Sequence, residues 1–277
     1  IYYIQLGQRV GSQTFYNYFD AFGFTSRTGV DLPSETGFMQ YYKANQLGEV
    51  QLASSAFGQA MAITPLQMCT AVAAAVNGGY LVTPHVVDKI TDANGNVIEE
   101  IGANVRRQVI SKSTSNVIRQ IMEYEVGAGT GGGKYAYVSG YRIGGKSGTS
   151  EQLNMNRRAD GDYKKVASFA AVLPADDPEI IVYVMLDDPN NARTDYSSLL
   201  AAPVVGNIIS EIAPYLGIAA DGEDRSQTVV TVPNLVGTEW SSAQVQLNMK
   251  GLRHHLAEST PSQAAGAVTS QSPPPGA

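Results

Sequence analysis

The residues with the clearest potential for chemistry lie together in one short segment, residues 140–152. Its first part, from Gly140 to Ser147, satisfies the spacing G-x-x-x-x-G-K-[ST], in which backbone N–H groups and a lysine hold phosphate. Its second part, from Lys146 to Thr149, reads Lys-Ser-Gly-Thr. On an extended strand those four residues could hold a carboxylate instead. The two interpretations need different local structures, so the backbone at Lys146 decides between them.

A phosphate site needs a helix that begins at about Lys146, because the free N–H groups and the dipole of a helix N-terminus hold the anion. Residues 147–150 disfavour a helix, and Gly148 alone costs roughly 1 kcal/mol inside one. One observation favours nucleotide binding: the apolar run at residues 180–186 ends at Asp187, which could ligate a metal ion. Because many buried strands end in an aspartate, a P-loop nucleotide-binding protein stays a remote alternative.

A strand over residues 141–149 satisfies the second interpretation. Alternation places Lys146 and Gly148 on one face of the strand and Ser147 and Thr149 on the other. Gly148 has no side chain, so an extended ligand could lie against the strand and pair with its main chain. Lys146 supplies positive charge, and the hydroxyls of Ser147 and Thr149 could donate hydrogen bonds to a carboxylate. The N–H of Thr149 could form half of an oxyanion hole.

Short segments on both sides of this motif make the second interpretation specific. In chain order they are Thr-Gly-Val-Asp-Leu-Pro-Ser-Glu at 28–35, Phe-Gly-Gln at 57–59, Thr-Pro-Leu-Gln at 64–67, Asn-Gly-Gly at 77–79, the Lys146 motif, Ser-Phe at 168–169, Pro174, and Asp-Asp-Pro at 187–189. Together they resemble the C-terminal half of the transpeptidase domain of a class B penicillin-binding protein. The resemblance extends over almost all of residues 1–217.

The resemblance implies a serine-type D,D-transpeptidase, which cross-links peptidoglycan stem peptides through an acyl-serine intermediate and is acylated by β-lactams. It implies catalytic roles for Lys146 and Thr149 and substrate binding by Ser147, Gly148 and Thr149, with no metal and no cofactor. The family also uses a Ser-x-x-Lys nucleophile pair and a Ser-x-Asn motif, and neither spacing occurs in this chain. We therefore expect a fragment that begins just after the second motif, contains no nucleophile and is inactive alone.

The same fold could also serve a non-catalytic sensor or scaffold that binds penicillin or muropeptides. A Ser-x-x-Lys pair in a preceding segment would identify an enzyme, and its absence would identify a binding protein. In either case the resemblance implies a location on the extracytoplasmic face of the bacterial cell membrane, through an anchor in a missing N-terminal part. No run of about 18 apolar residues, the length that spans a bilayer, lies in this chain.

The composition of the chain excludes several classes of protein and of binding site. The net charge is −6 and there is no basic stripe, which excludes general nucleic-acid binding. A hydrophobic content of 43% over 277 residues is enough for one large domain and one small domain. Cys69 is the only cysteine, so an internal disulfide and a multi-cysteine metal site are excluded.

The elements expected around the motif form a mixed α+β fold, in which helices pack on one antiparallel sheet. It corresponds to part of the fold of penicillin-binding proteins and β-lactamases. The expected strands of the sheet are residues 141–149, at an accessible edge, then 166–173 and 179–186. A hairpin over residues 86–90 and 97–101 turns at Asn94-Gly95. Helices are expected at residues 1–10, 13–22, 64–76, 111–125 and 203–216.

The polar segment 219–227 separates an expected transpeptidase part, residues 1–222, from a second unit, residues 228–277. The second unit begins with Val-Pro-Asn-Leu-Val-Gly at 232–237 and ends with Pro-Pro-Pro-Gly at 273–276. It resembles a PASTA repeat, a small α+β module found on penicillin-binding proteins of Gram-positive bacteria, here clipped at its end. The resemblance implies muropeptides or cell-division proteins as partners. We expect a helix over residues 241–250 and strands over 252–256 and 267–272.

Overall fold

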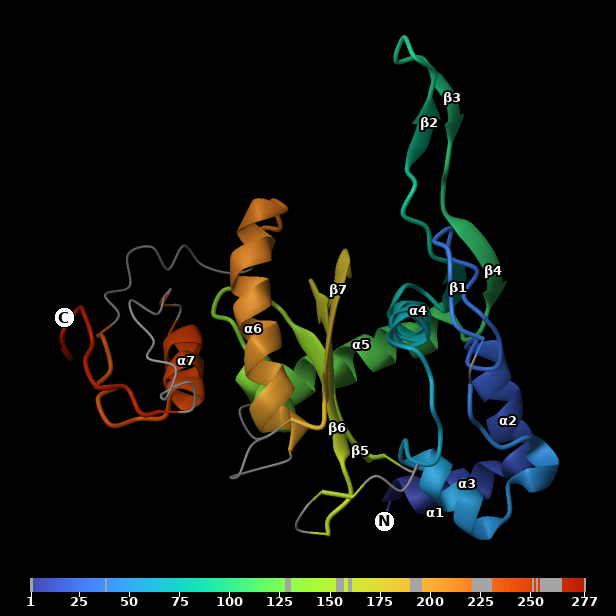
Figure 1. Ribbon diagram of the computed structural model, residues 1–277, viewed down its shortest axis with the longest axis horizontal. Coiled ribbons are helices and arrows are strands. Elements are labelled where there is room, and N and C mark those ends of the chain that lie inside the picture. Colours follow the sequence, from blue (N-terminus) through green and yellow to red (C-terminus); the bar gives the residue numbers. More distant parts are fainter. Residues whose placement is uncertain are drawn as a thin grey trace. The chain divides into compact units, whose positions relative to one another are not determined.

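The computed structural model describes residues 2–37, 39–127, 131–152, 157–158, 161–189, 196–220, 231–250, 252, 254 and 266–276. The chain divides into two compact units, one of residues 1–118 with 150–157 and the other of residues 119–149 with 158–277. Figure 1 labels their helices and strands. Both units combine helices with antiparallel strands, which confirms the predicted mixed α+β class.

The first unit begins with helices. They are α1 (Tyr2–Val10), α2 (Ser12–Ala21), the 3-10 helix η1 (Ala44–Gln46), α3 (Glu49–Ala56) and α4 (Pro65–Val76). Helix α1 packs against α3 at Gly7, where an added Cβ atom would lie 2.5 Å from the Cβ atom of Ala56. The sequence predicted α1, α2 and α4 but not α3, which has only Leu52 and Ser55 buried and so shows a weak apolar pattern.

Helix α4 begins at the residue that the sequence indicated. Thr64 Oγ1 accepts a hydrogen bond from the N–H of Gln67 at 3.1 Å, and Gln67 Oε1 accepts one from the N–H of Thr64 at 2.9 Å. Pro65 occupies the first helical position, where its missing N–H costs nothing. The buried Gln67 also donates from Nε2 to the carbonyl of Ser26 at 2.8 Å. The cap therefore fixes the loop after α2 as well as the helix.

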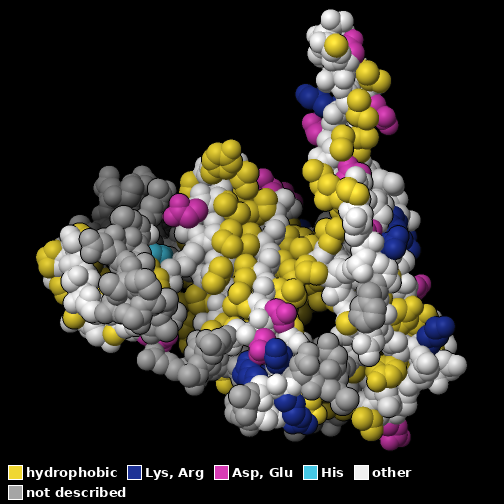
Figure 2. Space-filling view, in the orientation of Figure 1, with side chains coloured by type: hydrophobic (Ala, Val, Ile, Leu, Met, Phe, Trp, Pro, Cys, Tyr) yellow, Lys and Arg dark blue, Asp and Glu magenta, His cyan; other side chains and the backbone are white. Residues whose placement is uncertain are grey.

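Two antiparallel ribbons follow α4. Strand β1 (Tyr80–Thr83) pairs with β4 (Asn104–Gln108), and β2 (Lys89–Thr91) pairs with β3 (Val97–Glu100). The β2–β3 hairpin confirms the predicted turn, in which Gly95 has a φ angle of 86°. The β1–β4 ribbon was not predicted. Figure 2 shows hydrophobic side chains along the β2–β3 hairpin, and its exposed members include Ile90, Val97 and Ile98.

A three-stranded sheet in the order β5–β6–β7 forms the centre of the second unit. Its strands are β5 (Gly144–Glu151), β6 (Lys165–Leu173) and β7 (Ile180–Asp187). Strands β6 and β7 pair antiparallel, from Val166 opposite Asp187 to Leu173 opposite Ile180, as predicted. These three strands form one sheet, as predicted, and the β1–β4 and β2–β3 ribbons are separate from it.

Helix α6 (Ser197–Tyr215) packs on this sheet and forms the core with it. Its buried residues Ala201, Ala202, Val205, Ile209 and Ala213 belong to the same apolar cluster as Phe169, Ala171 and Leu173 of β6. By length and composition alone α6 could cross a membrane, but this burial accounts for its apolar character. The predicted start at Pro203 is wrong, because burial of the preceding alanines extends the helix back to Ser197.

Two further helices precede the sheet, α5 (Lys112–Gly127), which was predicted, and the 3-10 helix η2 (Gly132–Ala136). Strand β5 starts at Gly144, later than the predicted residue 141. The reason is a turn at Gly140, where φ is 85°, followed by Arg142. The Arg142 guanidinium lies 2.6 Å from Glu123 and 2.5 Å from Asp176, which holds this residue outside the strand.

The C-terminal region contains helix α7 (Trp240–Met249), which confirms the helix predicted over residues 241–250. Helix α7 lies beside α6. Three of its residues form a small apolar cluster with residues before and after the helix: Leu235, Trp240, Ala243, Leu247, Leu252 and Val268. The predicted strand over 267–272 is wrong: Ala267 forms only an isolated bridge with Glu239, too short for a ladder. Most of the predicted strand over 252–256 and of the linker over 219–227 lies outside the described residues.

Candidate active-site strand

The Lys-Ser-Gly-Thr segment lies entirely within β5. The backbone is extended through Lys146, where a phosphate loop requires the first turn of a helix. The P-loop interpretation is therefore wrong. Among the three described strands of its sheet, β5 is an outer strand, and its one neighbour among them is β6. This is the edge position that the sequence predicted for the motif.

Close packing explains the two glycines that precede Lys146. An added Cβ atom on Gly145 would lie 2.5 Å from Cε1 of Phe169, which is fully buried. On Gly144 it would lie 3.1 Å from Cγ2 of Val172. Any larger residue would push β5 away from β6, so these glycines set the position of the strand and hence of the side chains that follow.

Lys146 and Gly148 are exposed on β5, and Ser147 is half-buried. The Nζ atom of Lys146 donates a hydrogen bond to the carbonyl of Ser147 at 2.7 Å. Within the described part of the chain Lys146 has no carboxylate partner, so its charge is accessible to an anion. At Gly148 the backbone carbonyl accepts from the Ser168 hydroxyl at 3.3 Å, and an added Cβ atom would lie 3.0 Å from that hydroxyl oxygen.

The Thr149 side chain is held by the first residue of α6. Its Oγ1 donates to Ser197 Oγ at 2.9 Å and accepts from the Ser197 N–H at 3.1 Å. Ser197 is only 2% exposed. Sequence reasoning did not find Ser197 as a site residue. The sequence does contain a serine pair before an apolar run, which is typical of the start of a helix. This pattern does not indicate which strand the helix packs against.

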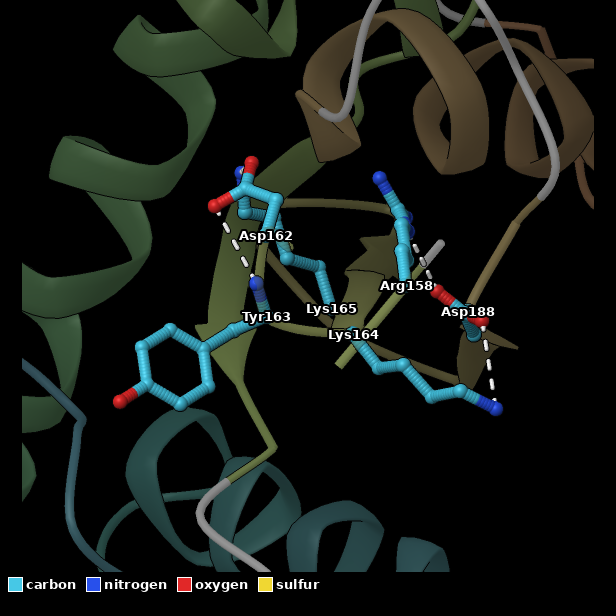
Figure 3. Close-up of polar contacts among 6 residues, drawn as sticks. All are labelled: Arg158, Asp162, Tyr163, Lys164, Lys165 and Asp188. Atoms are coloured by element: carbon cyan, nitrogen blue, oxygen red, sulfur yellow. Dashed lines mark hydrogen bonds and ion pairs between the residues drawn. The ribbon is translucent and has the colours of Figure 1, made fainter. Parts of the chain in front are cut away.

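A second polar cluster joins the connection after β5 to the end of β7 (Figure 3). Arg158 Nε lies 2.8 Å from Asp188 Oδ1, and Lys164 Nζ lies 3.6 Å from Asp188 Oδ2. The Asp188 N–H donates to the carbonyl of Lys165 at 2.8 Å. The hydrogen bond from Arg158 holds the pKa of Asp188 below its ordinary value. This cluster was also not predicted.

Comparison with known protein families identifies the chain. The penicillin binding protein transpeptidase domain family matches residues 1–210, and the PASTA domain family matches residues 230–277. The chain therefore belongs to the penicillin-binding protein transpeptidase family and carries a PASTA domain. Both resemblances noted in the sequence are confirmed.

Two curated relatives show how much of a longer protein the chain represents. It is 35% identical over 259 residues to the stage V sporulation protein D of Bacillus subtilis, covering 89% of this chain and 39% of that protein. It is 32% identical over 238 residues to the probable peptidoglycan D,D-transpeptidase FtsI of Caulobacter vibrioides, covering 83% of this chain and 38% of that protein. The chain thus spans less than half the length of these relatives.

A solved structure supports the fold assignment. Penicillin binding protein 3 of Mycobacterium tuberculosis, in complex with ampicillin, aligns with a TM-score of 0.67 at 29% sequence identity. The alignment covers 80% of this chain and 50% of that chain. The sheet and helices described above are therefore part of a penicillin-binding protein transpeptidase fold.

Proposed function

We propose that this chain is the C-terminal part of a serine-type peptidoglycan D,D-transpeptidase whose nucleophile lies in residues outside it. The observation that carries the proposal is strand β5, which presents Lys146, Ser147 and Thr149 at a sheet edge in a chain of the transpeptidase family. A relative named as a probable D,D-transpeptidase and a related structure with bound ampicillin support it.

In the proposed reaction a serine attacks the carbonyl carbon of the penultimate D-alanine of a stem peptide. The amide bond to the terminal D-alanine breaks, this residue leaves as a free amino acid with the serine proton, and the acyl group stays on the serine. An amine of a neighbouring stem peptide then attacks the ester, forms the new amide bond and restores the serine. A carboxylate and a developing oxyanion are the charges to be stabilised.

Residues of β5 have the chemistry for both charges. The Lys146 ammonium and the hydroxyls of Ser147 and Thr149 are proposed to bind the substrate carboxylate, where charge-assisted hydrogen bonds are stronger than neutral ones. The backbone N–H of Thr149 is proposed to donate to the oxyanion. Gly148 leaves the strand open, so that a peptide or a β-lactam can pair with the main chain. The proposed reaction needs no metal and no organic cofactor.

The proposal also covers location and partners. The protein would work at the extracytoplasmic face of the bacterial cell membrane, anchored by a segment outside this chain, in a Gram-positive type of wall. Stem peptides and β-lactams would be the ligands of β5. Wall muropeptides or cell-division proteins would be the partners of the PASTA domain, residues 230–277.

Labelling with a fluorescent penicillin tests the proposal. We expect the full-length protein to form a covalent adduct of the mass of one acyl group, and this chain alone to form none because it lacks a Ser-x-x-Lys pair. Intact-mass analysis and peptide mapping locate the adduct. An adduct on a serine of this chain would contradict the proposed division of the site. Reversible binding to the full-length protein without an adduct would support a non-catalytic sensor instead.

A further inference from the structure

The contact between Thr149 and Ser197 bears directly on how Thr149 can bind a ligand. A threonine hydroxyl has one hydrogen to donate. In this structure Thr149 donates that hydrogen to Ser197 Oγ at 2.9 Å. A ligand carboxylate needs the same hydrogen, because an ionised carboxylate only accepts hydrogen bonds. Binding must therefore rearrange the pair.

Ser197 can accommodate this rearrangement through a small turn of its side chain. Its hydroxyl can rotate and donate to Thr149 Oγ1, which frees the Thr149 hydrogen for the ligand. The Ser197 N–H already donates to the same oxygen at 3.1 Å. Thr149 Oγ1 would then accept two hydrogen bonds while it donates one, and such chains of hydrogen bonds polarise and strengthen one another.

The position of Ser197 fits this role. It is 2% exposed, so it cannot reach a ligand itself and can act only through Thr149. It is also the first residue of the 19-residue helix α6, whose first turn has no acidic residue. The partial positive charge of that helix end therefore adds to the polarisation of the Thr149 hydroxyl toward an anion.

We propose that Ser197 is a positioning residue, which changes from hydrogen-bond acceptor to donor when a carboxylate binds to Thr149. The inference rests on the proposed function, because it deepens the assignment of Thr149 to the carboxylate subsite. It predicts that Ser197 matters for ligands with a free carboxylate and not for the same ligands as neutral esters.

The test uses the full-length protein and one penicillin in two forms, the free acid and its methyl ester. The acylation rate constant of each form is measured for the wild type and for Ser197→Ala, which keeps the N–H and removes the hydroxyl. The acid-to-ester preference is the acylation rate constant of the acid divided by that of the ester. We expect Ser197→Ala to lower this ratio about three- to tenfold, the range expected for the loss of one neutral hydrogen bond. Ser197→Thr, which restores a hydroxyl, should recover the preference.

Two comparisons separate this role from a structural one. Ser210→Ala removes another half-buried hydroxyl of α6, which bonds to the carbonyl of Asn207, and should leave the preference unchanged. In a Thr149→Val background, Ser197→Ala should change the preference no further, because the residue it acts through is gone.

Each outcome is informative about a different claim. An equal loss of rate for acid and ester in Ser197→Ala, with a lower melting temperature, would overturn the inference and leave the proposed function standing. A wild-type protein that is not acylated at all would contradict the proposed function. In that case the affinities for the acid and the ester, measured by calorimetry on the same variants, still decide whether Ser197 supports carboxylate binding through Thr149.

Discussion

Lys146 and Thr149 lie on the same strand but are held in different ways. Lys146 is exposed, and its ammonium group bonds only to the neighbouring carbonyl of Ser147 among the contacts described. Thr149 is tied by two hydrogen bonds to the buried Ser197. Changes at Lys146 should therefore affect ligand chemistry more than folding, whereas changes at Thr149 affect both.

Replacing Lys146 by alanine in the full-length protein should slow acylation by a β-lactam about ten- to a hundredfold. Losing a hydrogen bond to a charged group costs about 1.5–3 kcal/mol, and each 1.36 kcal/mol is about tenfold in rate. The melting temperature should stay unchanged because the side chain is exposed. Stopped-flow acylation kinetics measure the rate. The control Lys89→Ala removes the same charge from the exposed strand β2. A wild-type rate in Lys146→Ala would remove this residue from the site.

At the scale of elements, one carboxylate closes the loop that follows α2. Glu35 Oε1 accepts from the N–H and the hydroxyl of Thr28 at 2.6 and 2.7 Å, and Oε2 accepts from the Gly29 N–H at 3.0 Å. Burial alone would raise the pKa of Glu35, but the hydrogen bonds from Thr28 and Gly29 outweigh it and hold the pKa below its ordinary value. The resemblance segment at residues 28–35 thus has a structural function.

Replacing Glu35 by glutamine should lower the free energy of unfolding by about 1–3 kcal/mol at pH 7, since hydrogen bonds to a charged acceptor are lost. Because the pKa of Glu35 is lower in the folded protein than in the unfolded chain, the ionised carboxylate stabilises the folded state at pH values above the unfolded-state pKa of about 4.3. This stabilisation is lost as the pH falls through the folded-state pKa. The difference between wild type and variant should therefore shrink below about pH 4. Urea unfolding at several pH values measures it, with the exposed Glu99→Gln as control. A difference that does not depend on pH would exclude the carboxylate as its source.

Helices and strands were predictable where the residues that determine them lie next to one another in the sequence. Helix α4 has its cap residues Thr64 and Gln67 beside its apolar run, and β6 and β7 are continuous apolar segments buried on one or both faces. The β1–β4 ribbon was missed because β4 (Asn104–Gln108) is mostly polar and exposed. Its strand character comes from pairing with β1, which a local pattern does not contain.

The same limit applies to the candidate site. The Lys146–Thr149 motif was found because its residues are adjacent in the chain. Ser197 lies 48 positions from Thr149, and the two meet only because α6 packs on the sheet through its buried alanines and Ile209. The partnership of Arg158 with Asp188 likewise depends on two loops that come together in space. Such contacts follow from tertiary packing and not from spacing.

At the scale of the whole molecule, the described residues of the second unit form two separate apolar clusters. One joins β6, β7 and α6, with fully buried residues such as Phe169 and Ile209. The other lies in the PASTA region, and its buried members among the described residues are Leu235, Ala243 and Leu247. Although α7 lies beside α6, no residue of α7 belongs to the larger cluster as described. The small cluster should therefore contribute little to the stability of the larger one.

Deleting residues 228–277 from the full-length protein should lower the melting temperature of the transpeptidase part by less than about 5 °C, which corresponds to roughly 1–2 kcal/mol for a domain of this size. Differential scanning calorimetry measures it. Two matched substitutions calibrate the result: Ile209→Ala in α6 should cost about 2–5 kcal/mol in the main transition, whereas Leu247→Ala in α7 should leave that transition in place. A larger drop on deletion, reproduced by Leu247→Ala, would mean that the PASTA domain stabilises the transpeptidase part through the contact between α6 and α7.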